Sequence, residues 1–199
     1  MQNIGHRGLV TAMALSAVAV AVIAPAVGAG TKPAIMPTSI AGAKLGLGAN
    51  AYKALLGKPY RFEAAKGGDF KLPGFQQPSN YTRIVFPKRK TDVYFKDGID
   101  KAIEIVTWNK AYRTAGGAGP CSTFAQLKKA YGSKAKPTPG NFGSTYFVGR
   151  SLIFELNPPA DDRVTAVALY DGSRPDWNKP GGALLTASFV GANGTTRCS

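Results

Sequence analysis

The sequence predicts an α+β protein built from two tandem units, each a short helix followed by antiparallel β-strands. The chain reads twice in a similar way, with Gly57 matching Gly132 at an offset of 75 residues. In each copy an amphipathic segment that ends in glycine precedes alternating stretches rich in β-branched and aromatic residues. We therefore expect a first repeat over residues 39–113 and a second repeat, with a C-terminal extension, over residues 114–199.

The chain opens with a pattern typical of a secretory signal peptide. Arg7 precedes an apolar run over residues 9–24, and small residues follow up to Ala29. The run is shorter than the roughly 20 residues that a membrane-spanning helix prefers. We expect residues 1–29 to be a signal peptide, residues 30–38 a flexible lead-in, and the mature protein to be secreted, or extracytoplasmic, without a transmembrane anchor. A retained membrane anchor is the alternative.

Each repeat is expected to begin with a helix of about two turns. Gly48 takes the N-cap position of the first helix, and Ser122 or Thr123 that of the second. Gly57 and Gly132 lie where a C-terminal cap favours glycine. The residues expected on the buried faces are Tyr52, Leu55 and Leu56 in the first helix and Phe124, Leu127 and Tyr131 in the second.

The strands are predicted from alternation of apolar and polar residues. They are residues 81–86, 91–95 and 101–108 in the first copy, 145–148, 151–156 and 164–170 in the second, and a last apolar segment at 183–190. Asp97 and Gly98 separate two of these strands, and this dipeptide supplies the positive φ angles of a tight hairpin turn. Antiparallel pairing follows.

Cysteine and histidine usage limits the chemistry. Cys121 and Cys198 are the only cysteines, and an even count in an exported chain predicts a disulfide between them. No histidine follows His6, so a Ser-His-Asp mechanism or a zinc site lacks its main residue in the mature chain. We expect a non-catalytic protein with no cofactor and no metal.

The chain is a polycation, with a formal net charge of +14, or +13 once Arg7 is removed with the signal peptide. Such a charge favours anionic partners such as cell-wall polymers, anionic lipid or acidic protein faces, while solubility alone is the alternative. Nucleic acid is not an expected partner of an exported protein. The basic residues expected to carry this attraction are Lys88, Arg89, Lys90, Lys128 and Lys129.

Three segments carry a family resemblance: Leu45-Gly46-Leu47, the run Leu-Leu-Gly-Lys-Pro at 55–59 and Phe-Lys-Asp-Gly at 95–98. Together with the repeat, they resemble the tandem-repeat proteins with the β-lactamase inhibitor protein fold and the small outer-membrane assembly lipoproteins of the SmpA/OmlA type. The resemblance implies one continuous concave sheet, with helices on one face and binding on the open face. The chain departs from the inhibitor, which carries a disulfide in each repeat.

Strand alternation predicts which residues occupy the open face. The residues expected to point to the core are Ile84, Val93, Phe95, Ile103, Ile105 and Phe154. The candidate binding residues on the opposite face are Tyr81, Arg83, Tyr94, Glu104, Trp108, Tyr146 and Glu155. Tyr, Trp and Arg are enriched at binding hot spots. Alternatively, these aromatic residues complete the core.

The function expected from these features is that of an exported, non-catalytic binding protein that engages a protein or an anionic cell-envelope partner with its concave sheet face. One alternative is a cell-envelope hydrolase with Glu104 and Glu155 as acid and base, which requires carboxyl groups roughly 5 or 9 Å apart. Inhibition of a β-lactamase-type enzyme is another alternative.

Overall fold

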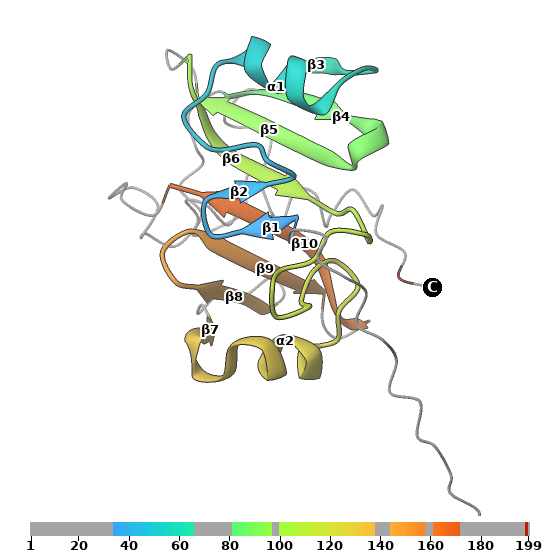
Figure 1. The fold of residues 1–199 in the computed structure, drawn as a ribbon, viewed down its shortest axis with the longest axis vertical. Helices are drawn as coiled ribbons and strands as arrows, with labels where there is room; N and C mark the ends of the chain where they lie inside the picture. Colours follow the sequence, from blue (N-terminus) through green and yellow to red (C-terminus); the bar gives the residue numbers. More distant parts are fainter. Residues whose placement is uncertain are drawn as a thin grey trace, which may run out of the picture. The chain divides into compact units, whose positions relative to one another are not determined.

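A large antiparallel sheet forms the centre of the protein, and two α-helices lie on one of its faces (Figure 1). The computed structural model describes residues 34–65, 81–96, 100–137, 144–157, 161–171 and 198. All of them belong to one of the two units into which the chain divides, Lys32–Ser199. The α+β class predicted from the sequence is confirmed.

The described elements include two helices, each followed by strands of the large sheet. They are β1 (Ile35–Met36), β2 (Ser39–Ile40), α1 (Ala49–Leu56), β3 (Arg61–Ala65), β4 (Tyr81–Phe86), the 3₁₀ turn η1 (Pro87–Arg89), β5 (Thr91–Lys96), β6 (Ala102–Thr107), α2 (Phe124–Tyr131), the 3₁₀ turn η2 (Gly132–Lys134), β7 (Ala135–Pro137), β8 (Ser144–Val148), β9 (Leu152–Asn157) and β10 (Asp161–Tyr170). Each helix is thus followed by four described strands of the large sheet.

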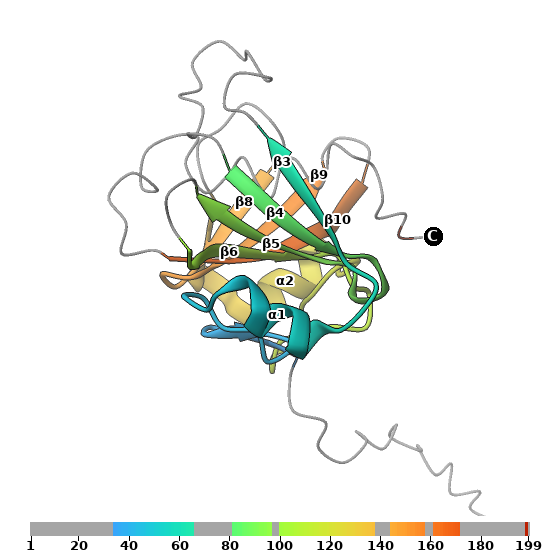
Figure 2. The same cartoon turned by 90° about the horizontal axis from the view of Figure 1, so that it is seen from above.

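The two halves meet at the middle of the sheet. The order of its eight described strands is β3-β4-β5-β6-β10-β9-β8-β7, and every neighbouring pair is antiparallel. β6 pairs with β10, with Ile105 opposite Leu169. Seen from above, both helices and the small β1-β2 hairpin lie on the same side of this sheet (Figure 2). The other side of the sheet carries no described helix.

α1 begins after Gly48, which caps it without a side-chain hydrogen bond. Tyr52 and Leu56 are buried one turn apart, as the helical period predicts. Leu55, which was expected on the same buried stripe, is 44% exposed. The reason is geometric, because a residue three positions after Tyr52 lies on the flank of so short a helix rather than over its buried centre.

α2 begins at the capping residue Thr123. The Gln126 N–H donates to the Thr123 hydroxyl (3.2 Å), and the Thr123 N–H donates to Gln126 Oε1 (2.8 Å), which completes a capping box. Leu127 is buried, while Phe124 and Tyr131 are partly buried and pack against the core. All three side chains expected on the buried face of α2 therefore pack toward the core.

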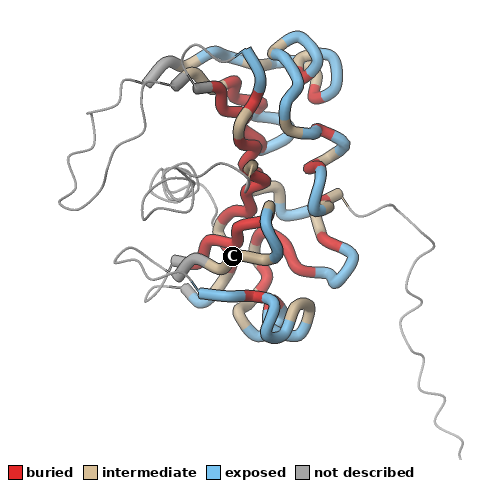
Figure 3. The backbone as a smooth tube through the Cα atoms, turned by 90° about the vertical axis from the view of Figure 1, so that its left-hand side faces the viewer, coloured by how far each residue is buried: buried red, intermediate tan, exposed pale blue. Residues whose placement is uncertain are grey.

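The main core lies between the helices and the sheet. It joins Tyr52 of α1 to Phe95 of β5, with ring centroids 5.9 Å apart, and Tyr131 of α2 to Phe154 of β9, 5.5 Å apart. A second buried cluster occupies the opposite face of the sheet and consists of Tyr94, Val106, Ile153, Ala166, Ala168 and Tyr170. Buried residues consequently run through the whole middle of the fold (Figure 3).

Several elements differ from the expected ones. Residues 30–38, expected to be a flexible lead-in, include β1, whose buried Ile35 donates its N–H to the Arg113 carbonyl (3.0 Å). The edge strands β3 and β7 were not predicted at all. The expected turn at Asp97 and Gly98 and the expected strand at 183–190 lie outside the described residues. No described helix is long and apolar enough to cross a membrane.

The predicted disulfide between Cys121 and Cys198 is confirmed, with a sequence separation of 77 residues. The Cys121 N–H donates to the Val164 carbonyl (2.7 Å), which holds Cys121 beside β10. The disulfide therefore fixes Cys198 close to β10 as well. A cross-link of this span restricts the unfolded chain strongly.

We expect Cys198→Ser to lower the free energy of unfolding by about 4 kcal/mol, since a loop of this length carries that closure entropy. Urea unfolding of both proteins measures the difference. In the unreduced wild-type protein, thiol titration after denaturation should find no free thiol. Two free thiols, or equal stability of the variant, contradict the prediction.

Candidate functional site

The face of the sheet opposite the helices carries a row of polar side chains across five strands. In register, Glu63 on β3 lies opposite Arg83 on β4, Arg83 opposite Tyr94 on β5, Tyr94 opposite Glu104 on β6, and Glu104 opposite Tyr170 on β10. Residues opposite one another in an antiparallel sheet project to the same face. We call these five residues the cross-strand row.

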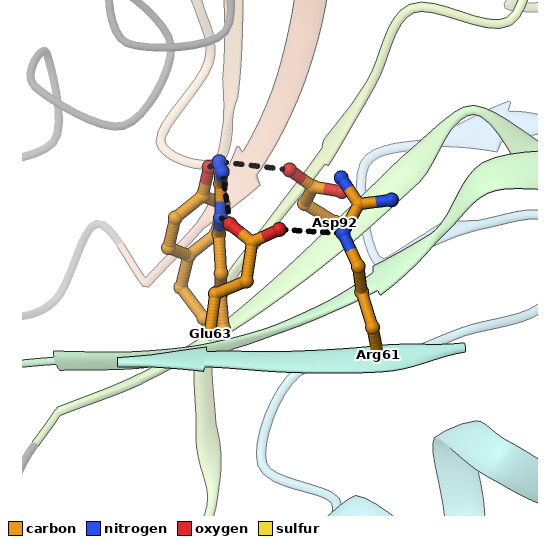
Figure 4. A network of polar contacts seen from close by, with 5 residues as sticks. Arg61, Glu63 and Asp92 are labelled. Atoms are coloured by element: carbon orange, nitrogen blue, oxygen red, sulfur yellow. Dashed lines mark hydrogen bonds and ion pairs between the residues drawn. The ribbon is translucent and has the colours of Figure 1, made fainter. Parts of the chain in front are cut away.

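Arg83 is the centre of the charged end of this row. Its neighbours Glu63 and Asp92, together with Arg61, are labelled in Figure 4. Its Nε donates to Glu63 Oε2 (2.7 Å), and its Nη1 donates to Asp92 Oδ2 (3.2 Å) and to the Tyr94 hydroxyl oxygen (3.4 Å). Arg61 Nε also contacts Glu63 Oε1 (2.6 Å). Burial alone raises the pKa of Glu63, but hydrogen bonds from the two arginines bring it below its ordinary value. Glu63 is therefore ionised at neutral pH.

Asp92 is much more buried than Glu63, and its chemistry differs accordingly. Its side chain is only 3% exposed. Burial raises the pKa of Asp92 to about 7, although the charge of Arg83 acts to lower it. Asp92 Oδ1 is buried and has no hydrogen-bond partner among the described residues. Asp92 consequently changes its charge close to neutral pH.

Glu104 lies in the middle of the row, between Tyr94 and Tyr170, and it is fully buried. Within the described part of the chain, neither of its carboxyl oxygens has a hydrogen-bond partner. Burial raises the pKa of Glu104 well above its ordinary value, and the charge of Glu155 raises it further. An ionised, unpaired carboxylate is costly to bury, so Glu104 is protonated at neutral pH.

Glu155 lies on β9 and is 7% exposed. Burial raises its pKa to about 8. In register, Glu155 lies opposite Ala166 on β10, whereas Glu104 lies opposite Tyr170, four residues further along the same strand. That offset is about 13 Å along the strand. Both carboxyl groups lie on the face opposite the helices, as expected, but they are buried and not exposed.

The structure places five of the seven predicted binding residues on the face opposite the helices. Tyr94, Glu104 and Glu155 face away from the helices as alternation predicts, but they are buried instead of exposed. Arg83 is on the same face with its side chain 15% exposed, and Trp108 is partly buried against the second cluster. The interpretation that the aromatic residues of this face complete a core fits these positions better than an exposed hot spot does.

One residue of the predicted site lies on the other face of the sheet, and the side chain of another lies outside the described part. Tyr146 was expected on the open face, but it lies opposite Phe154 in register and therefore faces the helices. Its ring packs 5.0 Å from that of Phe124 on α2. Tyr81 is the first residue of β4, and its side chain lies outside the described part.

A β-bulge explains why one more residue, Ile103, lies on the face opposite to the predicted one. Tyr94 pairs with Glu104 while its neighbour Phe95 pairs with Ala102, so Ile103 is an extra residue on β6. Ile103 was expected in the main core, but it packs against the second cluster instead. Strict alternation along a strand cannot reveal such an insertion.

Sequence reasoning missed three members of this site. Asp92 has the same parity as Tyr94 within the predicted strand 91–95, so alternation could have placed it on this face. Tyr170, at the end of a predicted strand, could have been found in the same way. Glu63 could not, because no strand was predicted around it.

The basic residues expected to attract an anionic partner lie away from the cross-strand row. Lys88 and Arg89 in η1 and the adjacent Lys90 are exposed, as are Lys128 and Lys129 on α2. The side chain of Arg89 donates from Nε to the Leu56 carbonyl (3.2 Å), which brings η1 against the C-terminal end of α1. These cations therefore belong to the helix side of the molecule.

The described residues contain no group of three or more His, Cys, Asp or Glu side chains that could hold a metal ion. Comparison with protein-family models, with curated proteins and with solved structures finds no match to this chain. The described residues thus offer buried carboxyl groups with raised pKa values on the face opposite the helices, and exposed cations that include those of η1 and α2.

We expect the free energy of unfolding to fall as the pH rises from about 5 to about 8. Asp92 and Glu155 have folded pKa values of about 7 and about 8, above ordinary values of 3.8 and 4.5, and the pKa of Glu104 is raised as well. The folded state therefore binds more protons than the unfolded state in this window. The lowered pKa of Glu63 acts in the opposite direction, but only below pH 4.5.

Thermal unfolding across this pH range measures the effect. Glu104→Gln removes one of the titrating groups, so its melting temperature should fall less steeply with pH. Asp162→Asn, at an exposed site, is the matched control and should leave the slope unchanged. A wild-type protein whose stability rises between pH 5 and 8 contradicts the assignment of buried protonated carboxyls.

Replacement of Arg83 tests the charged end of the row. Arg83→Met removes the partner of Glu63 and of the buried Asp92, and we expect a loss of about 3 kcal/mol in urea unfolding at pH 8. Arg61→Met removes a partner of the same Glu63 at a side chain that is 59% exposed, so its cost should stay below about 1 kcal/mol. Equal effects of the two substitutions show that Arg83 is not the centre of the network.

Proposed function

We propose that this protein is an exported, non-catalytic binding protein that engages anionic cell-envelope material through exposed Lys and Arg side chains. The supporting observation is the imbalance of exposed charge in the described residues. The exposed basic residues there are Lys44, Lys58, Arg61, Lys88, Arg89, Lys90, Lys101, Lys110, Lys128, Lys129, Lys134, Lys136 and Arg150. The exposed acidic residues in the same part of the chain are Asp100 and Asp162.

The burial of acidic residues strengthens this imbalance. Asp92, Glu104 and Glu155 contribute three negative charges to the formal count, yet all are buried and have raised pKa values. The charge that a partner of the processed protein meets at neutral pH is consequently more positive than the formal +13 of the mature chain. A field of this sign attracts anionic polymers and surfaces and increases their rate of association.

The sequence between β6 and β9 adds to the same argument. Residues 105–154 contain no Asp or Glu, and this stretch includes all of α2. Its basic residues are Lys110, Arg113, Lys128, Lys129, Lys134, Lys136 and Arg150. A surface of one sign over so long a stretch costs stability through self-repulsion, which an anionic partner relieves.

We also propose that the two halves are copies of one unit, as in the families that the sequence resembles. Support comes from the matching order of one helix and four strands in each half, and from the helices' 75-residue offset. In those families binding takes place on the open sheet face. Here the burial of Tyr94, Glu104 and Glu155 favours the exposed basic residues as the binding surface instead.

We expect binding of the processed protein to isolated cell-wall fragments to weaken steeply as salt rises, because exposed charges are screened within about 8 Å at physiological ionic strength. A co-sedimentation assay from low to high salt measures this. The double variant Lys128→Glu with Lys129→Glu should weaken binding at low salt, and Gln126→Lys should preserve it. Binding that is insensitive to salt and to the double variant refutes the proposal.

A further inference from the structure

We propose that the outer face of α1 docks on the surface of an anionic lipid bilayer. This inference rests on the proposed function, because it names one anionic partner and the element that contacts it. Docking of α1 adds an apolar contribution to binding, which exposed cations alone do not supply.

α1 presents an apolar surface to solvent. Ala51, Ala54 and Leu55 are exposed on the side of the helix turned away from the core, and Leu55 is 44% exposed. Leu47, just before the helix, is 37% exposed, and Phe62 on the following strand is 53% exposed. We call these five residues the α1 apolar surface. They are the large exposed hydrophobic residues of the described part, together with two neighbouring alanines.

The equivalent helix in the second half lacks this property. α2 exposes one alanine, Ala125, and otherwise the polar residues Gln126, Lys128 and Lys129. At the offset of 75 residues, Gln126 and Lys129 correspond to Ala51 and Ala54. The two helices cap the same face of the same sheet, so packing does not require α1 to be apolar outside. The difference points to a contact made by α1 alone.

Cations lie along α1 and just beyond its C-terminal end. The Lys53 ammonium lies 4.8 Å from the centre of the Phe62 ring, and Lys58 is exposed just after the helix. η1 lies against the C-terminal end of α1 through the hydrogen bond from Arg89 to Leu56, and Lys88 is exposed in the same turn. Residues 34–62 contain no Asp or Glu. The apolar side chains thus lie beside several cations toward the C-terminal end of α1, whereas the exposed Asp100 lies beside Gly48 at its start.

This combination suits an anionic bilayer better than a wall polymer or a protein. Shallow insertion of Leu, Phe and Ala into the headgroup region, with Lys and Arg at the lipid phosphates, is the general mode of interfacial helices. A hydrated anionic polymer makes no use of exposed Leu55 or Phe62. A protein hot spot normally centres on a large aromatic residue in a pocket, whereas alanines occupy the middle of α1.

Vesicle co-sedimentation of the processed protein tests the inference, with phosphatidylcholine vesicles compared with vesicles that contain phosphatidylglycerol. Ala51→Glu on α1 and Ala125→Glu on α2 form a matched pair, because both add one negative charge at an exposed alanine in the first turn of a helix. We expect Ala51→Glu to weaken binding to the anionic vesicles at least about fivefold, and Ala125→Glu to change it less than about twofold.

Leu55→Asn removes apolar surface without a change of charge, and it should weaken vesicle binding while binding to cell-wall fragments stays unchanged. Circular dichroism of each variant confirms that the helices are retained. Wild-type protein that binds wall fragments but not anionic vesicles overturns this inference and leaves the proposed function standing. Equal losses in Ala51→Glu and Ala125→Glu also overturn it. Wild-type protein that binds neither material refutes both proposals.

Discussion

The antiparallel pairing of β6 with β10 is the contact on which the rest of the architecture depends. It places the last strand of each half at the centre, with Ile105 beside Leu169, and so joins two four-stranded sheets into one. Each helix precedes four strands and packs on one face of them. Because the pairing joins the two sets of strands edge to edge, both helices lie on the same side of the joined sheet. The other side is then left to the residues of opposite parity, among them Glu104 and Tyr170.

The pairing also determines the electrostatics of the protein. It sets Glu104 between Tyr94 and Tyr170 in a buried position where no described group hydrogen-bonds to the carboxyl. A carboxyl in that position stays protonated, because ionisation without a partner costs more than retention of the proton. At the edge of the same row, Arg83 holds Glu63 ionised. One row of residues therefore changes from paired ions at the sheet edge to neutral acids at its centre.

The sequence predicted the parts of the fold that local patterns determine. The β4 range matches the predicted residues 81–86, and the second helix begins at the expected cap Thr123, since alternation and capping depend on near neighbours. The site was harder to predict, because alternation shows which face a residue occupies but not whether that face is covered. Glu104 lies on the face of the sheet that alternation predicts, but it is buried where exposure was expected. The bulge at Ile103 and the partner of Arg83 on β3 depend on pairing between distant segments, which no local pattern encodes.

The burial of acids and the exposure of bases have a common consequence for partner choice. A protein that neutralises its buried carboxyls by protonation keeps few exposed negative charges beside many exposed Lys and Arg side chains. Surface cations are cheap to leave in water, and an external anion can bind to them. On α1 the same surface adds exposed Leu55, close to the cation Lys53 and to η1. Charge then supplies attraction at a distance, and apolar contact supplies the discrimination between a lipid surface and a hydrated polymer.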